Sequence, residues 1–299
     1  MKAKSLLTAC LFMLAVGAQA ANDARAILHH DKKPVAIYDA DKLADAINAA
    51  VEGDTIYLSA GAFPTITLDK AITIKGAGAT TDIAEGVTIN IANTPTLNAA
   101  LLDAVEVLGN VVVNSEINGF TIKSVDCESV VFNTNCPKAL IDRCDIMEFK
   151  TTDVMKDIYF RNCYISKLTN EKWIYNKCTF VNCNIRECGA GRFINCQIRG
   201  GSDIQSSIFS YCMLNSSYLS IESSSYIENC KKVKMYSSFK TAEECIANGW
   251  LGNDGTPIGM YGGKTPYTLS PSGPKETSSS VKVDDKEKKL NVTITVSPK

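Results

Sequence analysis

The chain has 299 residues, of which 45% are hydrophobic and 21% are charged, and its formal net charge is -1. This length and apolar content suffice for one large domain or two small ones with a substantial core. The composition excludes a disordered chain, a collagen-like repeat and a strongly basic nucleic-acid-binding protein.

The first twenty residues have the pattern of a secretory signal peptide. Lys2 and Lys4 precede an apolar run over residues 6–16, and Ala18-Gln19-Ala20 follows as an A-x-A cleavage pattern. Cleavage near Ala20 predicts a protein that is secreted, periplasmic or on the cell surface. A lipoprotein-like pattern ending at Cys10 is the alternative. No later stretch is long and apolar enough to predict a membrane span.

A capping helix is predicted ahead of a run of short strands. Residues 21–35 are expected to form a lead-in, and residues 39–51 have Leu43, Ile47 and Val51 at helical spacing. Short apolar segments punctuated by glycine then predict strands at 55–58, 65–68, 71–75, 87–91, 111–113 and 119–123. A helix in this place would cover the open edge of a solenoid's first coil.

Cysteine carries the clearest repeat. Eleven of the twelve cysteines fall between Cys127 and Cys245. Seven of them have an apolar residue three positions before, and six of these also have one two positions after: Cys144, Cys163, Cys178, Cys183, Cys196, Cys212 and, without the second, Cys230. Asparagine stands directly before four of the seven, as Asn162, Asn182, Asn195 and Asn229.

The spacing around each cysteine predicts two strands joined by a tight bend. The cysteine and the apolar residue two positions later share one face of a strand, whereas the apolar residue three positions earlier is out of phase. Asparagine tolerates the left-handed conformation that such a bend requires. One unit recurs every 15 to 19 residues if Cys183 is skipped, which is typical of a solenoid.

Stacked units would bring the cysteines into one inward, reduced ladder. Its predicted members are Cys144, Cys163, Cys178, Cys196, Cys212 and Cys230. Scattered disulfides are the alternative, since an exported chain meets oxidising conditions. No metal site is predicted, because no C-x-x-C pair exists and His29 and His30 lie far away, before the fold is expected to begin.

A second solenoid type also fits part of the repeat. Small and large residues alternate at steps of five, as in Cys178, Cys183 and Cys188 and in Ile204, Phe209, Leu214 and Leu219. This spacing is typical of pentapeptide-repeat β-helices, although it does not persist through residues 147–157.

Several segments resemble pectin-lyase-like right-handed parallel β-helix proteins of the secreted Bacteroidetes type. The likeness lies in residues 43–58, in Ile72-Thr-Ile-Lys-Gly-Ala-Gly78, in Ile117-Asn-Gly-Phe-Thr-Ile122 and in the Asn-Cys units. It covers roughly residues 36–240. The resemblance implies an all-β, right-handed parallel β-helix with its cap helix over residues 36–245. It implies no single activity, because this fold hosts lyases, hydrolases, esterases and adhesins.

Residues 246–299 are expected to form a turn-rich tail with a β-hairpin. Residues 255–263 resemble the tails of secreted β-helix proteins of the same type, residues 278–280 read as a linker, and residues 281–283 and 290–296 as the two strands. The tail is predicted to cover the open edge of the last coil. A docking or surface-attachment element is the alternative.

No catalytic residue is assigned. The family's hydrolases carry several clustered Asp, a Gly-His-Gly segment and an Arg-Ile-Lys segment, and these are missing here. Arg186 and Arg199 each follow the inward apolar residue of their unit, so they should point outward at equivalent places. With Arg192 and Lys177 they form a candidate strip for an anionic glycan. Aromatic residues that are expected to contact sugars are Tyr164, Trp173, Tyr211, Tyr218 and Tyr226.

These features favour an exported, non-catalytic β-helix that binds a polysaccharide or serves as a cell-surface scaffold, with no cofactor. One alternative is a uronate-polysaccharide lyase that uses an Arg or Lys base, for which Ca²⁺ would be a cofactor. The other is an adhesin or assembly protein with a protein partner. The oligomeric state is not indicated.

Overall fold

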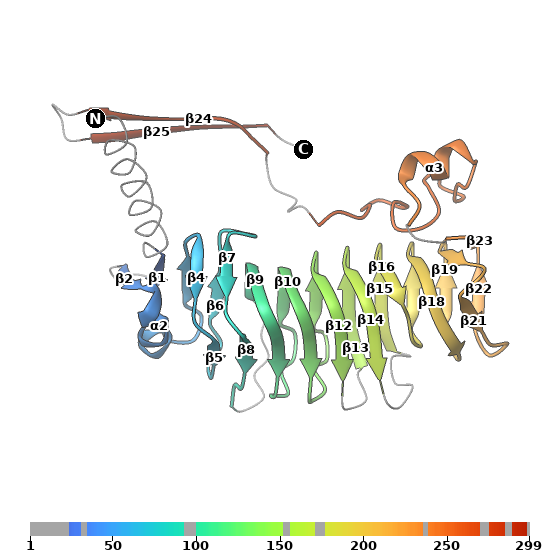
Figure 1. Cartoon of the computed structure of the whole chain (residues 1–299), viewed down its shortest axis with the longest axis horizontal. Helices are drawn as coiled ribbons and strands as arrows, with labels where there is room; N and C mark the ends of the chain where they lie inside the picture. The colour runs from blue at the N-terminus through green and yellow to red at the C-terminus, as the bar shows by residue number, and fades with distance from the viewer. Residues whose placement is uncertain are drawn as a thin grey trace, which may run out of the picture. The chain divides into compact units, whose positions relative to one another are not determined.

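The computed structural model describes residues 24–30, 35–92, 100–151, 156–170, 177–235, 239–269, 275–284 and 289–297. The protein is a right-handed parallel β-helix of about 8 turns, and its described residues include two short α-helices. This confirms the fold class predicted from the sequence. The chain divides into two compact units, residues 1–269 and residues 270–299, and the first contains the whole solenoid (Figure 1).

The N-terminal end of the solenoid is closed by a small cap. Its elements are β1 (Arg25–His29), β2 (Ala36–Asp39), the 3-10 turn η1 (Ala40–Lys42) and α2 (Leu43–Ala49). Helix α2 buries Leu43, Ala46 and Ile47, which confirms the predicted inward places of Leu43 and Ile47. It is shorter than the predicted range 39–51, and Val51, which lies beyond its end, is 51% exposed. Strand β1 pairs antiparallel with both β2 and β3 (Thr55–Leu58).

The expected lead-in is therefore part of the fold. His29 pairs with Thr55 in the β1–β3 ladder. The Nδ1 atom of His30 lies 2.6 Å from Oδ2 of the buried Asp54. The prediction that both histidines precede the fold was wrong, because β1 pairs with β2 and also with β3, about thirty residues further along the chain, and is thereby part of the cap.

The coils follow one another by parallel pairing. Their strands are β4 (Gly61–Phe63), β5 (Ile66–Leu68), β6 (Thr73–Lys75), β7 (Thr81–Ile83), β8 (Gly86–Ile89), β9 (Ala100–Val113), β10 (Thr121–Phe132), β11 (Leu140–Asp142), β12 (Asp145–Thr151), β13 (Lys156–Arg161), β14 (Tyr164–Asn170), β15 (Lys177–Val181), β16 (Asn184–Glu187), β17 (Arg192–Ile194), β18 (Gln197–Ile204), β19 (Ile208–Ser210), β20 (Met213–Asn215), β21 (Leu219–Ile221), β22 (Tyr226–Glu228) and β23 (Lys231–Val233). In Figure 1 they stand side by side along the solenoid axis. The strands predicted between residues 55 and 123 lie in β3, β5, β6, β8, β9 and β10.

A column of phenylalanine rings fills the interior of the middle coils. Phe160, Phe180, Phe193 and Phe209 pair in register on successive strands and are fully buried. Their ring centroids lie 4.6, 4.9 and 5.0 Å apart. The sequence steps between them are 20, 13 and 16 residues, so the coils do not keep the multiples of five that a pentapeptide repeat requires.

Three residues after each of these phenylalanines, the chain passes a sharp bend and a cysteine. The residue before each cysteine has a positive φ, and the four asparagines Asn162, Asn182, Asn195 and Asn229 have φ of 55°, 52°, 50° and 51°. This is the left-handed conformation that asparagine adopts at low cost. Arg143 and Tyr211 take the same conformation before Cys144 and Cys212, so the bend belongs to the coil rather than to the asparagine.

The cysteines after the bends form a row of free thiols. Its members are Cys144, Cys163, Cys183, Cys196, Cys212 and Cys230. Most of these thiols lie close to a carbonyl of the preceding coil. The Sγ atom of Cys163 is 3.3 Å from the Ile141 carbonyl oxygen, and that of Cys212 is 3.4 Å from the Phe193 carbonyl oxygen. Burial raises the pKa of the thiols of Cys196 and Cys212 well above the usual range, so they stay protonated.

The predicted cysteine ladder was wrong at one position. Cys183, not Cys178, follows the bend of its coil, because Asn182 takes the left-handed conformation and Asn184 pairs with Gln197 in the next coil. Cys178 lies on β15 before the bend, buried, and burial raises its thiol pKa to about 12. Both cysteines satisfy the apolar spacing, so the choice rested on a regular interval of 15 to 19 residues between units, and that interval selected the wrong one.

Beyond the last coil, the chain turns back along the side of the solenoid. It forms α3 (Ala242–Ala247), whose N-terminus is closed by a capping box between Thr241 and Glu244. Residues 239–269 contact the bends of Asn182 and Tyr211. In the part of the chain that the structure describes, they do not pair with β21, β22 or β23, but Cys245 of α3 packs in one buried cluster with Val233 of β23. That the tail covers the open edge of the last coil stays a prediction.

The second unit is a β-hairpin of β24 (Lys275–Asp284) and β25 (Lys289–Ser297). The two strands pair antiparallel, with Val281 opposite Val292 and Val283 opposite Leu290. The hairpin was predicted, but residues 278–280 belong to its first strand rather than to a linker.

Candidate functional site

One flat sheet runs along the solenoid before the bends. It consists of β11, β13, β15, β17, β19 and β22, paired in that order and in parallel. The middle residue of each paired triplet points into the core, as the buried Phe180 and Phe193 show. The residues on either side of it point outward, because side chains alternate along a strand. The sheet therefore carries two rows of outward-pointing side chains, and the phenylalanine column packs beneath it in the core.

The first outward row is rich in aromatic and apolar side chains. Its members in register are Leu140, Tyr159, Thr179, Arg192, Ile208 and Tyr226, and they are named here the Tyr159 row. Tyr159 is 47% exposed, Ile208 41% and Tyr226 60%, and Arg192 is also exposed. Neighbouring members are about 4.8 Å apart, the spacing of paired strands. Four of five successive strands thus carry a large side chain open to solvent, namely Tyr159, Arg192, Ile208 and Tyr226, while the half-buried Thr179 lies between the first two.

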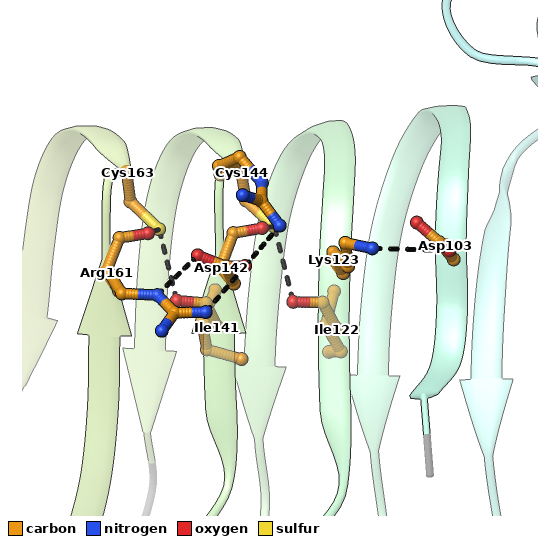
Figure 2. A network of polar contacts seen from close by, with 9 residues as sticks. Asp103, Ile122, Lys123, Ile141, Asp142, Cys144, Arg161 and Cys163 are labelled. Atoms are coloured by element: carbon orange, nitrogen blue, oxygen red, sulfur yellow. Dashed lines mark hydrogen bonds and ion pairs between the residues drawn. The ribbon is translucent and has the colours of Figure 1, made fainter. Parts of the chain in front are cut away.

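The second outward row begins with a series of ion pairs. Lys75, Asp103, Lys123, Asp142 and Arg161 occupy one register position in successive coils, so positive and negative charges alternate. The Nζ atoms of Lys75 and Lys123 each lie 3.7 Å from Oδ2 of Asp103. Figure 2 shows Lys123 directed toward Asp103 and Arg161 directed toward Asp142 across neighbouring strands.

Asp142 is the buried centre of this series. It is 2% exposed and accepts two hydrogen bonds from Arg161, at 2.9 and 3.0 Å, while Nη2 of Arg143 lies 2.8 Å from Oδ2. The hydrogen bond to Asp142 raises the pKa of the Arg161 guanidinium. Both cations pair with the carboxylate in a buried place where an unpaired charge would be costly, which makes this cluster structural.

Of the predicted cationic strip, Arg186 and Arg199 lie together and Arg192 does not. Arg186 on β16 and Arg199 on β18 take equivalent positions in adjacent coils, because Ile185 pairs with Ile198. Arg186 is exposed and Arg199 is half-buried. Arg192, however, lies on β17, before the bend, and belongs to the Tyr159 row. Expecting it beside the other two was wrong because the bend at Asn195 turns the chain onto a different sheet. Lys177 begins β15, and its side chain lies outside the described residues.

The aromatic residues proposed to contact sugars do not lie together either. Tyr226 is in the Tyr159 row and Tyr218 is exposed in the turn after β20. Tyr164 packs edge-on against Phe239, with ring centroids 6.4 Å apart, and Tyr211 is half-buried in a bend. Trp173 lies outside the described residues. Tyr159 itself was missed, although it stands one residue before Phe160 in the repeat frame.

The sheet after the bends carries a row of carboxylates that sequence reasoning also missed. Asp82, Glu106, Asp126 and Asp145 pair in register on β7, β9, β10 and β12. Partial burial, followed by the charge of Asp126, raises the pKa of Asp145 to about 6. Burial, followed by the charges of Asp82 and Asp126, raises the pKa of Glu106. The steps of 24, 20 and 19 residues between these carboxylates were a usable signal, since each equals the length of one coil.

The same row continues under the returning segment 239–269. Its next members are Tyr164, Asn184, Gln197 and Met213. The Gln197 side chain donates to the Lys240 carbonyl at 2.6 Å and accepts from the Lys240 N–H at 2.8 Å. One bend away, Asn182 Nδ2 donates to the carbonyls of Met260 and Gly262 at 3.0 and 2.7 Å. The segment thus covers this sheet toward the C-terminal end and leaves the Tyr159 row exposed.

Comparisons with known proteins add no function to this geometry. No family model, no curated protein and no solved structure matches the chain. The resemblance to pectin-lyase-like proteins stays a prediction from the sequence segments that carry it. In the part of the chain that the structure describes, no three His, Cys, Asp or Glu side chains are grouped to hold a metal ion. None of the described helices is long and apolar enough to cross a membrane.

Proposed function

We propose that this protein is a non-catalytic β-helix that binds an extended polysaccharide along the Tyr159 row. The observation that carries the proposal is the alignment of exposed Tyr159, Arg192 and Tyr226 on one flat sheet. A tyrosine ring offers an apolar face and a polar tip to a sugar. An arginine binds carboxylate or sulfate groups through two parallel hydrogen bonds. An acidic polysaccharide is thus the favoured ligand.

The row also has the repeat that an extended chain of sugars needs. Successive members are separated by one strand spacing, about 4.8 Å, which is close to the length of one hexose unit. The phenylalanine column beneath the row fixes the strands, so little conformational freedom is lost on binding. Export through the predicted signal peptide, and a place at the cell surface, belong to the same proposal.

The distribution of carboxylates on this sheet supports binding rather than hydrolysis. Asp103 of the second row lies on β9 and is ion-paired with Lys75 and Lys123. Within the sheet from β11 to β22, the two outward rows hold two carboxylates, Asp142 and Glu228, which lie five strands apart. That separation is about 24 Å at the usual strand spacing, whereas glycoside hydrolysis needs two carboxyl groups within about 5 to 10 Å. Asp142 is also bound to Arg161 and Arg143.

The test is retention of pectate, alginate and chondroitin sulfate in affinity electrophoresis. We expect retention by the wild type and a loss of about tenfold or more in affinity for the double variant Tyr159→Ala/Tyr226→Ala. Tyr218→Ala is the matched control, because Tyr218 is 62% exposed but lies outside the row. A double variant that binds like the wild type would overturn the proposed site. Loss of binding in Arg186→Ala/Arg199→Ala instead would move the site to the other sheet.

Turnover is the second readout. The same polysaccharides are incubated with the protein, with and without Ca²⁺, while ultraviolet absorbance reports unsaturated uronate. A flat trace is expected. A steady rise would contradict the non-catalytic proposal in favour of a uronate lyase. No affinity for any of the three polysaccharides would leave the adhesin alternative in its place.

A further inference from the structure

The last thiol of the cysteine row differs from the others in exposure. Cys144, Cys163, Cys183, Cys196 and Cys212 are fully buried, whereas Cys230 is partly exposed. The reason is its position in the last coil. Strand β23 pairs with β20, and no described strand lies on its other side. Cys230 is therefore the one member of the row that a solvent-borne reagent reaches without opening the solenoid.

The contacts of Cys230 favour its thiolate. The backbone N–H of Cys212 donates to the Cys230 Sγ atom at 3.3 Å. The Cys212 thiol is a second hydrogen-bond partner and the main cause that lowers the pKa of Cys230. The bonds with backbone groups lower it further, and partial burial opposes them.

Cys212 is also placed to react with Cys230. Met213 pairs with Lys231 in the parallel ladder of β20 and β23, so the two cysteines before them occupy one register position. Neighbouring strands bring such Cα atoms to about 4.8 Å, which lies inside the range of about 4.4 to 6.8 Å that disulfides require.

We propose that Cys230 is a site of thiol oxidation by peroxides and that Cys212 is its resolving partner. The Cys230 thiolate attacks one oxygen of a hydroperoxide and the O–O bond breaks. The sulfur becomes a sulfenic acid, and the leaving alkoxide or hydroxide takes up a proton. The Cys212 thiol then attacks the sulfenyl sulfur, the S–OH bond breaks, and water leaves with the thiol proton. Two thiols lose two electrons, and the peroxide gains them.

The product joins the last two coils by a covalent bond. The deeper thiols take no part, because the phenylalanine column and the coils on both sides exclude the oxidant. This inference does not depend on glycan binding.

The first test is alkylation of the folded chain by N-ethylmaleimide, followed by peptide mass mapping. Cys10 lies outside the described residues, so Cys10→Ser is the background of every sample. We expect one equivalent of label on Cys230, reacting about tenfold or more faster than any other site. Cys230→Ser should lose this label. Cys188→Ser is the control, because Cys188 is 7% exposed and outside the row. Slow labelling of Cys230, or equal labelling of several cysteines, would overturn the proposal.

The second test uses hydrogen peroxide on the same background. We expect a peptide cross-link between Cys212 and Cys230 in the otherwise unaltered chain, reversed by dithiothreitol. In Cys212→Ala the same treatment should leave a sulfenic acid on Cys230 that dimedone captures. Because the cross-link is mapped without changing either cysteine, a folding defect of Cys212→Ala does not affect the result. Absence of the cross-link, or a different pairing, would refute Cys212 as the resolving partner.

Discussion

Arg161 binds Asp142 through two parallel hydrogen bonds, Nε to Oδ1 at 2.9 Å and Nη2 to Oδ2 at 3.0 Å, between adjacent coils. The carboxylate is almost fully buried, while the Arg161 side chain is 45% exposed. The two residues therefore depend on the contact unequally. The buried Asp142 carboxylate cannot be solvated if its partners are removed, whereas the Arg161 guanidinium can be solvated by water.

This inequality predicts different costs for the two substitutions. Asp142→Asn leaves Arg143 and Arg161 facing a neutral amide and should lower the free energy of unfolding by about 2 to 4 kcal/mol. Arg161→Met leaves Arg143 beside the carboxylate and should cost about 1 kcal/mol. Urea unfolding followed by circular dichroism measures both. Equal costs, or a larger cost for Arg161→Met, would contradict the prediction.

The left-handed bends predict that glycine is tolerated at these positions better than a β-branched residue, although glycine usually weakens strands. Asn162 has a φ of 55°, and its buried Oδ1 has no hydrogen-bond partner among the described residues. Asn162→Gly should change stability by less than about 1 kcal/mol, since it keeps the conformation and removes an unsatisfied oxygen. Asn162→Val should destabilise by about 2 kcal/mol, because a β-branched residue is strained there. Thermal unfolding of the two variants, compared with the wild type, checks the order.

The same substitution at Asn182 should have an additional, distant effect. Its side chain donates to the carbonyls of Met260 and Gly262, and Asn182→Gly removes both bonds while keeping the bend. Backbone amides of residues 258–262 should then exchange with deuterium about tenfold faster. Asn162→Gly is the matched control, because it changes the same residue type at an equivalent bend. Faster exchange in both variants would show that the bend, rather than the side-chain contact, holds the segment.

The raised pKa of Asp145 predicts a stability that falls as pH rises. Its carboxyl titrates near pH 6 in the folded protein, against an ordinary value of 3.8. Between these values the folded state keeps a proton that the unfolded chain has released, so the stabilisation present below about pH 4 is lost as pH rises through about 6.

Asp145→Asn removes this titration. The variant should be more stable than the wild type by about 1 to 2 kcal/mol at pH 7.5, and the difference should shrink toward zero below pH 4. Urea unfolding at both values measures it, with the exposed Asp69→Asn as a control that should show no such change. A variant no more stable than the wild type at pH 7.5 would disprove the raised pKa.

Local spacing was enough to predict the bends and the cap helix. Asn162, Asn182, Asn195 and Asn229 stand where a left-handed residue is needed. Each lies between an apolar residue and a cysteine, and all but Asn229 have a second apolar residue three positions later. The same spacing could not choose between Cys178 and Cys183, since Phe180 serves as the later apolar residue of one and the earlier of the other. The asparagine before Cys183 was the deciding feature, because it marks the bend itself.

The candidate site depended on information that local spacing does not contain. Tyr159, Arg192 and Tyr226 lie 33 and 34 residues apart in sequence. They come into one row, each two strands from the next, only through the register of coils of unequal length. A fixed period would have misplaced them, since the coils of this row range from 13 to 20 residues. The carboxylates from Asp82 to Asp145 do recur at steps of one coil length, but the lengths differ, so only the pairing of the strands shows that they form a row.

The bonds between Asn182 and residues 260 and 262 span 78 and 80 residues of sequence. In a solenoid each coil otherwise touches only its neighbours, so unravelling is expected to proceed from an end one coil at a time. Here the chain beyond the last coil is tied back to a coil well inside the stack. If force were applied to the C-terminus, the hydrogen bonds of Asn182 would bear it first. The coils from β17 to β23 would then unfold together rather than one after another.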